Sequence, residues 1–425
     1  MKVDLNVDVH HLARVEGHGN IHVQVRDGQL VEARWEVVET PRYFEVMLRG
    51  KHFSSAAQLT ARICGICSIG HALCSLRATE HAMGIVTPPL ADTLRLLAKH
   101  GETLQSHYLH LFFLAAPDFL GLPSALPLQE KNPEVFHLAR QLKGMANQLC
   151  DVIAGRTTHP VSLVPGGVAR RPDGDTLKRL RDQLESSLAD LEATVVGLFS
   201  TFAIPDFVRE TEWVSLKGTA SFPWIGGDLV SSDGVLKQEP EYLAMTNEVV
   251  TDDNTSKWCS LSRPSFGVGA LARINNNFAL LHDEARQTAA VLGLKPVCHN
   301  PYMNSVAQLV ECVHVTHDTI RLIDEVLANP RGEIQVPVQP RAGRGVGAVE
   351  VPRGILYHCY EIDGEGCIQK ADCVIPTTQN NKNIHLDLQA LAPWLAGQGV
   401  DDSKATLLCE MLVRAYDPCI SCSVH

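Results

Sequence analysis

Apolar and polar residues alternate at the start of the chain. In GNIHVQVRDGQLVEARWEV, residues 19–37, the alternation continues on both sides of Asp27-Gly28. An Asp-Gly pair between two alternating segments predicts a β-hairpin with a two-residue turn, because both residues tolerate positive φ. The first 54 residues are therefore expected to be rich in β-structure.

From about residue 55 the apolar positions recur every three or four residues. The clearest case has leucine or valine at 177, 180, 184, 188, 191, 195 and 198. This spacing predicts a long amphipathic helix with Asp175 as its N-cap. The segments 93–115, 132–155 and 272–294 also have a helical period, and Pro133 stands at a first-turn position. A bundle of long helices is thus predicted over 55–330.

Between about 331 and 385 the composition changes again. Glycine, proline and β-branched residues dominate, which predicts loops and short strands before a last helix near ATLLCEMLVRAY. GRGVGA at 343–348 lacks the third glycine of a dinucleotide-binding loop, so we expect a turn there. The expected fold class is mainly α with minor β. We expect one domain over 1–425, with a β-rich part (1–54), a helical bundle (55–330) and a loop and β region with a C-terminal tail (331–425).

Composition limits the location and the partners. The 425 residues are 45% apolar and carry a net charge of −11, from 37 Lys and Arg against 48 Asp and Glu. This acidic balance argues against a nucleic-acid partner. No apolar segment has the length of a membrane span, and the first residues lack the apolar stretch of a signal peptide. With 13 cysteines, an odd number, we expect reduced thiols in a cytoplasmic protein.

Two CxxC pairs stand near the two ends of the chain. Cys64 and Cys67 lie in ARICGICSIGHA, and Cys419 and Cys422 lie in DPCISCSVH. Each pair can turn two thiolates toward one metal ion. A structural zinc site is one interpretation, although its pairs usually lie ~15–20 residues apart and more than 350 residues separate these two. Iron-sulfur ligation is another, but it usually takes three cysteines within a short run, which Cys74 fits poorly.

The motifs around both pairs resemble a known family. RICGIC followed by His71, together with DPCISCSVH, is similar to the paired signature of the large subunit of nickel-iron hydrogenases. HLARVEGHG near the start, RYFE at 42–45, VEVPRG at 349–354 and VIPTTQN at 374–380 extend the resemblance over essentially the entire chain. The compact length and the SCSVH ending are closer to the cytoplasmic multimeric group, which is heterodisulfide-reductase-linked or reduces nicotinamide or deazaflavin, than to membrane-linked enzymes.

The resemblance implies a nickel-iron centre on the four cysteines. Cys64 and Cys419 would be terminal thiolates on nickel. Cys67 and Cys422 would bridge nickel to an iron that carries carbon monoxide and cyanide. From its spacing, His71 is expected one helical turn beyond Cys67, where it could donate a hydrogen bond to the sulfur.

The resemblance also implies roles for five residues around this centre. Arg353 would lie over the metals, hydrogen-bond a cyanide and take part in splitting dihydrogen, with Asp417 as its ionic partner. Glu16 would receive a proton from a terminal cysteine thiol. Pro376 and Thr377 would line the diatomic ligands of the iron. Without the motifs, Arg353 would be read as a surface ion pair, Glu16 as a solvent-facing residue and Asp417 as an N-cap.

A second cation site is implied at the C-terminus. Glu45, the backbone carbonyl near Cys373 and His425 would hold a magnesium ion or a second iron. Precursors in the family carry an extension beyond this His that a protease removes, so the processed form is expected here, with a gene lacking the extension as the alternative. Many periplasmic members have an Asp between two histidines that KHGETLQSH does not match, and whether Glu102 replaces it is open.

The expected function is that of a catalytic subunit that interconverts dihydrogen with protons and electrons. Electrons would pass to a small iron-sulfur subunit and from there to a flavin or iron-sulfur partner. Candidates for this partner include a heterodisulfide-reductase-like complex. One alternative is a non-catalytic scaffold, as in the respiratory quinone reductase, but the four cysteines count against it. The other is a dihydrogen sensor, which would share every ligand.

Overall fold

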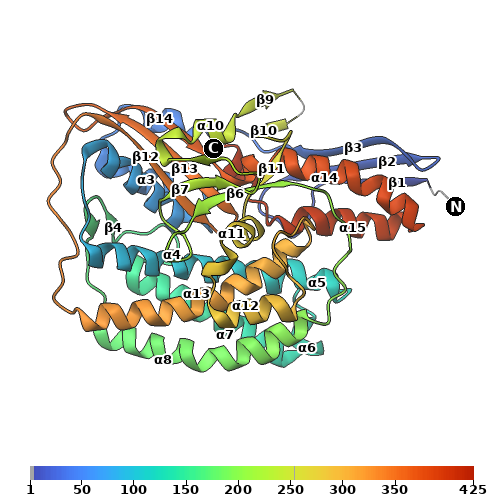
Figure 1. The fold of residues 1–425 in the computed structure, drawn as a ribbon, viewed down its shortest axis with the longest axis horizontal. Helices are drawn as coiled ribbons and strands as arrows, with labels where there is room; N and C mark the ends of the chain where they lie inside the picture. The colour runs from blue at the N-terminus through green and yellow to red at the C-terminus, as the bar shows by residue number, and fades with distance from the viewer. Residues whose placement is uncertain (1–3, 253) are drawn as a thin grey trace.

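Long helices and small sheets form separate layers in the computed structural model, which describes residues 4–252 and 254–425. Figure 1 shows four long helices side by side along one edge of the molecule: α4 (Pro89–Leu109), α7 (Pro133–Ala154), α8 (Gly174–Asp190) and α13 (Met303–Ala328). The sheets and the C-terminal helices cover the opposite side. The predicted fold class, mainly α with minor β, is confirmed. The division into one domain with three parts stays a prediction, and its first three residues lie outside the described ones.

Most of the remaining helices are shorter. They are α1 (Phe44–Leu48), α2 (Ala56–Thr60), α3 (Ser68–Met83), α5 (Ala116–Phe119), α6 (Leu128–Lys131), α9 (Gly197–Phe199), α10 (Leu243–Thr246), α11 (Ala270–Asn277), α12 (Asp283–Val291), α14 (Pro376–Gln398), α15 (Asp402–Ala415) and α16 (Ile420–Ser423).

The strands form small sheets. They are β1 (Leu5–Val9), β2 (Gly19–Arg26), β3 (Gln29–Val37), β4 (Leu163–Val164), β5 (Gly167–Val168), β6 (Glu212–Lys217), β7 (Asp228–Ser231), β8 (Leu236–Lys237), β9 (Val249–Thr251), β10 (Asn254–Trp258), β11 (Phe266–Gly267), β12 (Gly343–Val351), β13 (Gly354–Ile362) and β14 (Ile368–Val374).

The N-terminal hairpin is confirmed. β2 and β3 pair antiparallel, and Asp27 and Gly28 make the two-residue turn with φ of 50° and 70°. β1 adds a third strand beside β2. The apolar face of this sheet, including Trp35, packs on α14. The alternating pattern therefore marks a sheet with one buried face.

The N-cap of helix α8 lies two residues before the predicted one. Asp173, not Asp175, is the N-cap, and its carboxylate accepts a hydrogen bond from the backbone N–H of Thr176 at 2.9 Å. Asp173 has the extended backbone that an N-cap needs, whereas Asp175 already lies in the first helical turn. The prediction of the helix is right and that of its cap is wrong.

The segment 272–294 is not one helix. It contains the end of α11, a 3₁₀ turn at Phe278–Leu280 and then α12. The side-chain amides of Asn276 and Asn277 donate to the backbone carbonyls of Trp213 and Leu216. Side chains of this type compete with helical hydrogen bonding, which accounts for the break. Strands β6 to β11 also lie inside the region predicted to be helical.

The segment GRGVGA is a strand, not the predicted turn. Its glycines at alternate positions of β12 face α3, and a Cβ at Gly345 would lie only 2.1 Å from the carbonyl oxygen of Ala78. The absence of a side chain lets strand and helix backbones touch. β12 and β13 pair from Gly343 to Val351, so Pro352 and Arg353 form the tip of this hairpin.

Helix α14 begins at Pro376, within a segment expected to be loop and strand. Its first turns bury polar side chains, among them Thr378, Gln379 and Asn381. The sequence there therefore lacks the apolar period that would predict a helix. α15 confirms the predicted last helix, and the single turn α16 follows. In Figure 1 the C-terminus is drawn over the sheet layer, and α16 contacts α14 and β10.

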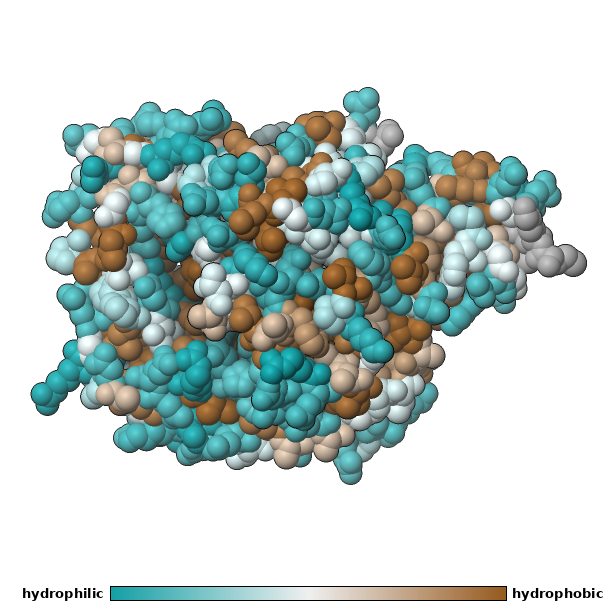
Figure 2. All heavy atoms as spheres, viewed as in Figure 1, coloured by the Kyte–Doolittle hydropathy of each residue, from teal (hydrophilic) through white to brown (hydrophobic). Residues whose placement is uncertain are grey.

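The face shown in Figure 2 is mostly hydrophilic, with hydrophobic residues scattered among polar ones. Among residues 4–252 and 254–425, no helix is both long and apolar enough to cross a bilayer.

Candidate metal centre

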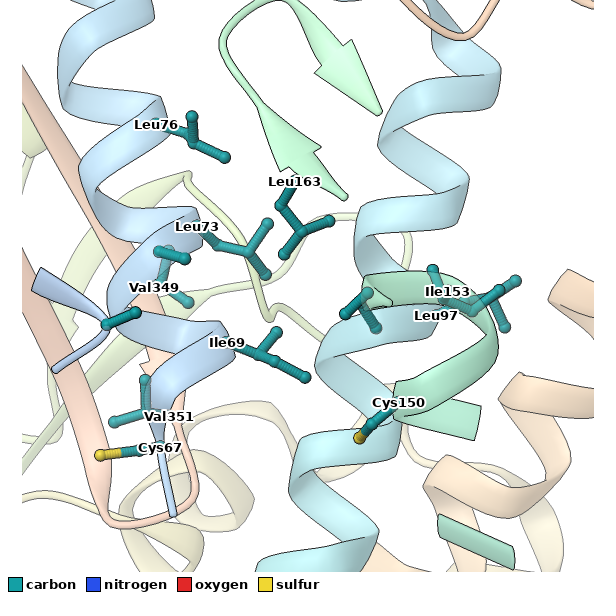
Figure 3. Close-up of a cluster of buried hydrophobic side chains, with 14 of the residues drawn as sticks. Cys67, Ile69, Leu73, Leu76, Leu97, Cys150, Ile153, Leu163, Val349 and Val351 are labelled. Carbon is teal, nitrogen blue, oxygen red and sulfur yellow. The ribbon is translucent and has the colours of Figure 1, made fainter. Parts of the chain in front are cut away.

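Four cysteine sulfurs meet in the interior of the molecule. Cys67 is the N-cap of α3 and Cys419 is the N-cap of α16, and Figure 3 shows Cys67 at the start of α3. The Sγ atoms of Cys64 and Cys419 lie 3.5 Å apart, and those of Cys67 and Cys422 lie 3.9 Å apart. All four sulfurs are within 4.8 Å of one another and buried. Two pairs from opposite ends of the chain thus make one tetrad.

The chemistry of this tetrad suits a soft metal ion. Hydrogen bonding with Cys419 holds the pKa of Cys64 well below the usual thiol range, and the backbone N–H groups of Ile66 and Cys67 also donate to its sulfur. Burial raises the pKa of Cys419 and Cys422 well above that range. Four neighbouring thiols can all ionise only if a bound cation compensates their charge. The residues therefore fit a thiolate-ligated metal site.

Glu16 touches the second cysteine pair. The Cys419 thiol donates to Glu16 Oε2 at 3.2 Å, and the Ser421 backbone N–H donates to the same oxygen at 3.0 Å. The Ser421 hydroxyl donates to Oε1. The backbone N–H of Ile420 donates to the carbonyl of Glu16 at 2.9 Å. The half-buried carboxylate is therefore fixed against a cysteine sulfur and is not a solvent-facing residue of the hairpin.

Arg353 is buried at the tip of the β12–β13 hairpin, with 4% of its surface exposed. Its Nε donates to the carbonyl oxygen of Asp417 at 2.5 Å, and Nη2 donates to Asp417 Oδ1 at 2.9 Å. Gln308 donates to the other carboxylate oxygen at 3.2 Å. The Nη1 of Arg353 is buried and has no hydrogen-bond partner within the described part of the chain. A buried cationic donor without an acceptor fits an anionic ligand of the metal centre.

Thr377 and Pro376 lie where α14 starts beside the tetrad. The Thr377 hydroxyl oxygen accepts a hydrogen bond from the backbone N–H of Cys419 at 3.0 Å. Its hydroxyl hydrogen remains available for another acceptor. Pro376 is buried as the first residue of α14.

His71 contacts His358 and not the sulfur of Cys67 that was expected. Its Nδ1 lies 3.3 Å from Nε2 of His358, and its Nε2 is buried without a partner among the described residues. Burial lowers the pKa of His71 to about 4. No hydrogen bond joins His71 to a sulfur within 4–252 and 254–425, because its bonded nitrogen faces β13. One-turn spacing predicts the helical position but not the side-chain rotamer.

Glu45 and His425 meet beside β14. His425 Nε2 lies 3.6 Å from Glu45 Oε1, and its Nδ1 lies 3.1 Å from the carbonyl oxygen of Cys422. Although burial alone would raise it, the hydrogen bond with His425 lowers the pKa of Glu45. Glu45 also accepts from the N–H of Cys373 at 2.8 Å, and the predicted role of the carbonyl near Cys373 as an ion ligand stays a prediction. The structure brings the three residues together.

Glu102 binds the backbone that follows the first cysteine pair. Its Oε1 accepts from the N–H of Gly70 at 2.9 Å, and its Oε2 lies 3.3 Å from the ammonium of Lys99. Both side chains are fully buried. Glu102 therefore pairs with Lys99 within α4 and ties that helix to α3 through the N–H of Gly70.

Ser421, inside the second cysteine pair, and Arg273, bound to the backbone before Arg353, were not predicted from the sequence. Ser421 binds Glu16, and its place inside the second CxxC was the available signal. Arg273 is a fully buried arginine of α11. No motif marks it in the sequence.

Comparisons with known proteins agree with this geometry. A profile of the family described as "Nickel-dependent hydrogenase" matches residues 42–137 and 263–425. The alpha subunit of sulfhydrogenase 2 from Pyrococcus furiosus is 32% identical over 419 residues, covering 99% of this chain and 98% of that protein. One subunit of the F420-non-reducing hydrogenase from Methanothermobacter thermautotrophicus is 28% identical, covering 97% of this chain and 93% of that protein.

A solved structure extends the similarity to the fold. The crystal structure of an NAD+-reducing [NiFe]-hydrogenase superposes with a TM-score of 0.83 at 29% identity, over 99% of both chains. The predicted recognition, fold class and hydrogenase function are confirmed. With its cysteine tetrad built from both ends and its whole length matched, the chain belongs to the nickel-dependent hydrogenase family.

Proposed function

We propose that this chain is a catalytic subunit in which Cys64 and Cys419 bind nickel terminally, while Cys67 and Cys422 bridge nickel to an iron carrying carbon monoxide and cyanide. The observation that supports this most is the single buried tetrad formed by both pairs. The bound metals would supply a soft, electron-rich centre that polarises dihydrogen. A scaffold role is disfavoured, since the four ligands are all present.

Heterolytic cleavage of dihydrogen releases a proton, which a nearby base must accept. The carboxylate of Glu16 is in hydrogen-bond contact with the Cys419 thiol at 3.2 Å. The thiol can therefore pass its proton to Glu16 Oε2. Ser421 holds both carboxylate oxygens, which orients the acceptor.

Arg353 supplies a fixed positive charge beside the tetrad. Asp417 binds its Nε and Nη2 and leaves Nη1 to donate. With the metals bound, Nη1 would donate to an iron-bound cyanide, and the charge of Arg353 would assist the polarisation of dihydrogen. Thr377 would donate its free hydroxyl hydrogen to another cyanide, and Pro376 and His71 would line the ligand pocket.

Glu45, His425 and the backbone at Cys373 are proposed to hold magnesium or a second iron. Such an ion would fix the C-terminal tail that carries Cys419 and Cys422. His425 Nε2 and Glu45 Oε1 lie 3.6 Å apart and face each other, so both atoms can bind one ion.

We also propose a cytoplasmic complex with a small iron-sulfur subunit and a further flavin or iron-sulfur subunit, of the heterodisulfide-reductase-like kind. The relatives support a multi-subunit enzyme, because each of their names denotes one subunit of a hydrogenase.

The test is the metal content of the purified enzyme. Thiolate tetrads bind either nickel or zinc, so the metal that is present distinguishes a catalytic site from a structural one. We expect about one nickel per chain and no zinc. Cys419→Ser should lose nickel, whereas Cys409→Ser, a buried cysteine of α15 outside the tetrad, should retain it. His425→Ala should lose the second divalent ion but keep some nickel. Zinc at one per chain in place of nickel would contradict the proposal.

A further inference from the structure

Arg273 uses every donor of its guanidinium in the interior of the protein. Nε and Nη2 donate to the two carboxylate oxygens of Glu311 at 2.6 and 2.7 Å. Nη1 donates to Glu350 Oε2 at 3.0 Å. The two remaining N–H groups reach the backbone carbonyls of Val351 and Pro352 at 3.0 and 3.1 Å. An arginine has five N–H donors, and here each has an acceptor.

The two carbonyls belong to the residues directly before Arg353. Val351 ends β12, and Pro352 and Arg353 form the two-residue tip of the hairpin. The orientation of these two peptide groups sets where the Cα of Arg353 lies and how its side chain leaves the backbone. Arg273 binds both peptide groups from a separate helix, α11. It is therefore placed to fix the tip independently of the strand pairing.

The two carboxylates that bind Arg273 are themselves fixed by further hydrogen bonds. Glu311 Oε2 also bonds His107 Nε2 at 2.8 Å, and Glu350 Oε1 accepts from the N–H of Leu216 at 2.8 Å. The ring of Trp224 lies 5.2 Å from the guanidinium carbon. These contacts come from α4, β6 and the segment before β7, so the arginine is rigid on every side.

We propose that Arg273 is a positioning residue that sets the Arg353 guanidinium over the cysteine tetrad through the carbonyls of Val351 and Pro352. This inference rests on the proposed role of Arg353. Lysine cannot replace Arg273, because a single ammonium has three donors and no planar fork. At least two of the five bonds must be lost in that variant, so the tip of the hairpin gains freedom.

Arg95 provides a matched control. It is also a buried arginine that pairs with a carboxylate by two bonds, to Glu80 at 2.8 and 2.6 Å, and donates to two backbone carbonyls, those of Val164 and Gly167. Its carbonyls belong to the β4–β5 hairpin, which does not carry Arg353. A loss that reflects only a disturbed buried ion pair would appear equally in Arg95→Lys.

The experiment compares Arg273→Lys, Arg353→Lys and Arg95→Lys in the purified enzyme complex. The readouts are nickel per chain, kcat and KM for dihydrogen, and the infrared bands of the iron-bound cyanides. We expect Arg273→Lys to retain nickel, to lower kcat about 10- to 100-fold, as a displaced catalytic group does, with KM within a factor of two, and to shift the cyanide bands in the same direction as Arg353→Lys. Arg95→Lys should leave the bands and kcat unchanged.

The outcomes separate this inference from the function it rests on. If Arg353→Lys shifts the bands and Arg273→Lys does not, the positioning role is wrong and the role of Arg353 stands. If neither shifts them, the proposed contact of Arg353 with cyanide is wrong, and the inference fails with it. Should Arg273→Lys not accumulate, Glu350→Gln removes one charged anchor while preserving the shape of the side chain. Glu350→Gln should give a smaller shift of the cyanide bands than Arg353→Lys. Unshifted bands in Glu350→Gln would likewise overturn the inference.

Discussion

Substituting Gly345 by alanine tests the close contact between β12 and α3. The added Cβ would lie 2.1 Å from the carbonyl oxygen of Ala78 and 2.2 Å from the backbone nitrogen of Ala82. Ordinary contact begins at 3.4 Å, so the deficit is 3.4 − 2.1 = 1.3 Å. Both obstructing atoms belong to a helix backbone and cannot rotate away. The strand must therefore move by about 1 Å, the scale at which overpacking is destabilising.

Overpacking typically lowers the free energy of unfolding by ~1–3 kcal/mol, and a clash with backbone falls at the upper end. The entropy of unfolding is about 2.1 cal/mol/K per residue, or roughly 0.9 kcal/mol/K for a chain of this length, so we expect the melting temperature to fall by about 3 °C. Because β12 carries Arg353 at its end, turnover should also fall, and a displacement of ~1 Å can reduce a rate by roughly 100-fold.

Differential scanning calorimetry of the purified enzyme measures this shift. Gly144→Ala is the matched control, since Gly144 lies exposed inside α7 with nothing within 4 Å of its added Cβ. There the same substitution should raise the melting temperature by about 1 °C, because alanine favours the helix by ~0.5–1 kcal/mol. A Gly345→Ala enzyme that melts within 1 °C of the wild type at full activity would refute the reasoning.

Two further substitutions probe protonation. Glu16→Gln should keep its nickel and slow turnover by about 10²–10⁴-fold, the usual contribution of a positioned base; a loss below threefold in a dye-reduction assay would contradict this. Burial lowers the pKa of His314 to about 3, and its Nδ1 accepts from the N–H of His282 at 3.1 Å. The unfolded chain, with a His pKa of ~6.5, binds the proton more readily, so stability is full above pH ~6.5 and is lost as the pH falls toward about 3. His314→Gln should weaken this dependence in melting curves recorded from pH 7 to pH 4, and an unchanged slope would count against it.

The sequence predicts local structure well where one signal suffices. Asp27-Gly28 specifies its turn through backbone freedom alone, and the period of Leu177, Leu180 and Leu184 specifies a buried helical face. The cysteine motifs similarly identify the tetrad, because the residues flanking both pairs are distinctive. Each of these signals is contained in a short segment.

Elsewhere the structure depends on contacts that the sequence does not encode locally. The start of α14 buries Thr378, Gln379 and Asn381 against other segments, so its face is polar and lacks an apolar period. The glycines of GRGVGA suggest flexibility until the backbone of α3 is placed against them. Arg273 has no motif, and its importance emerges only when Val351 and Pro352 are seen within its reach.

The distance along the chain between the two cysteine pairs has a thermodynamic consequence. Cys64 and Cys419 are 355 residues apart. An ion bound by both would close a loop of that length in any partly unfolded state. By the relation used for disulfide cross-links, closing such a loop removes chain entropy worth about 6 kcal/mol at 25 °C. A metal held here would thus tie the loop before α3 and the last helical turn, α16, into one cooperative unit, and its removal would release both segments together.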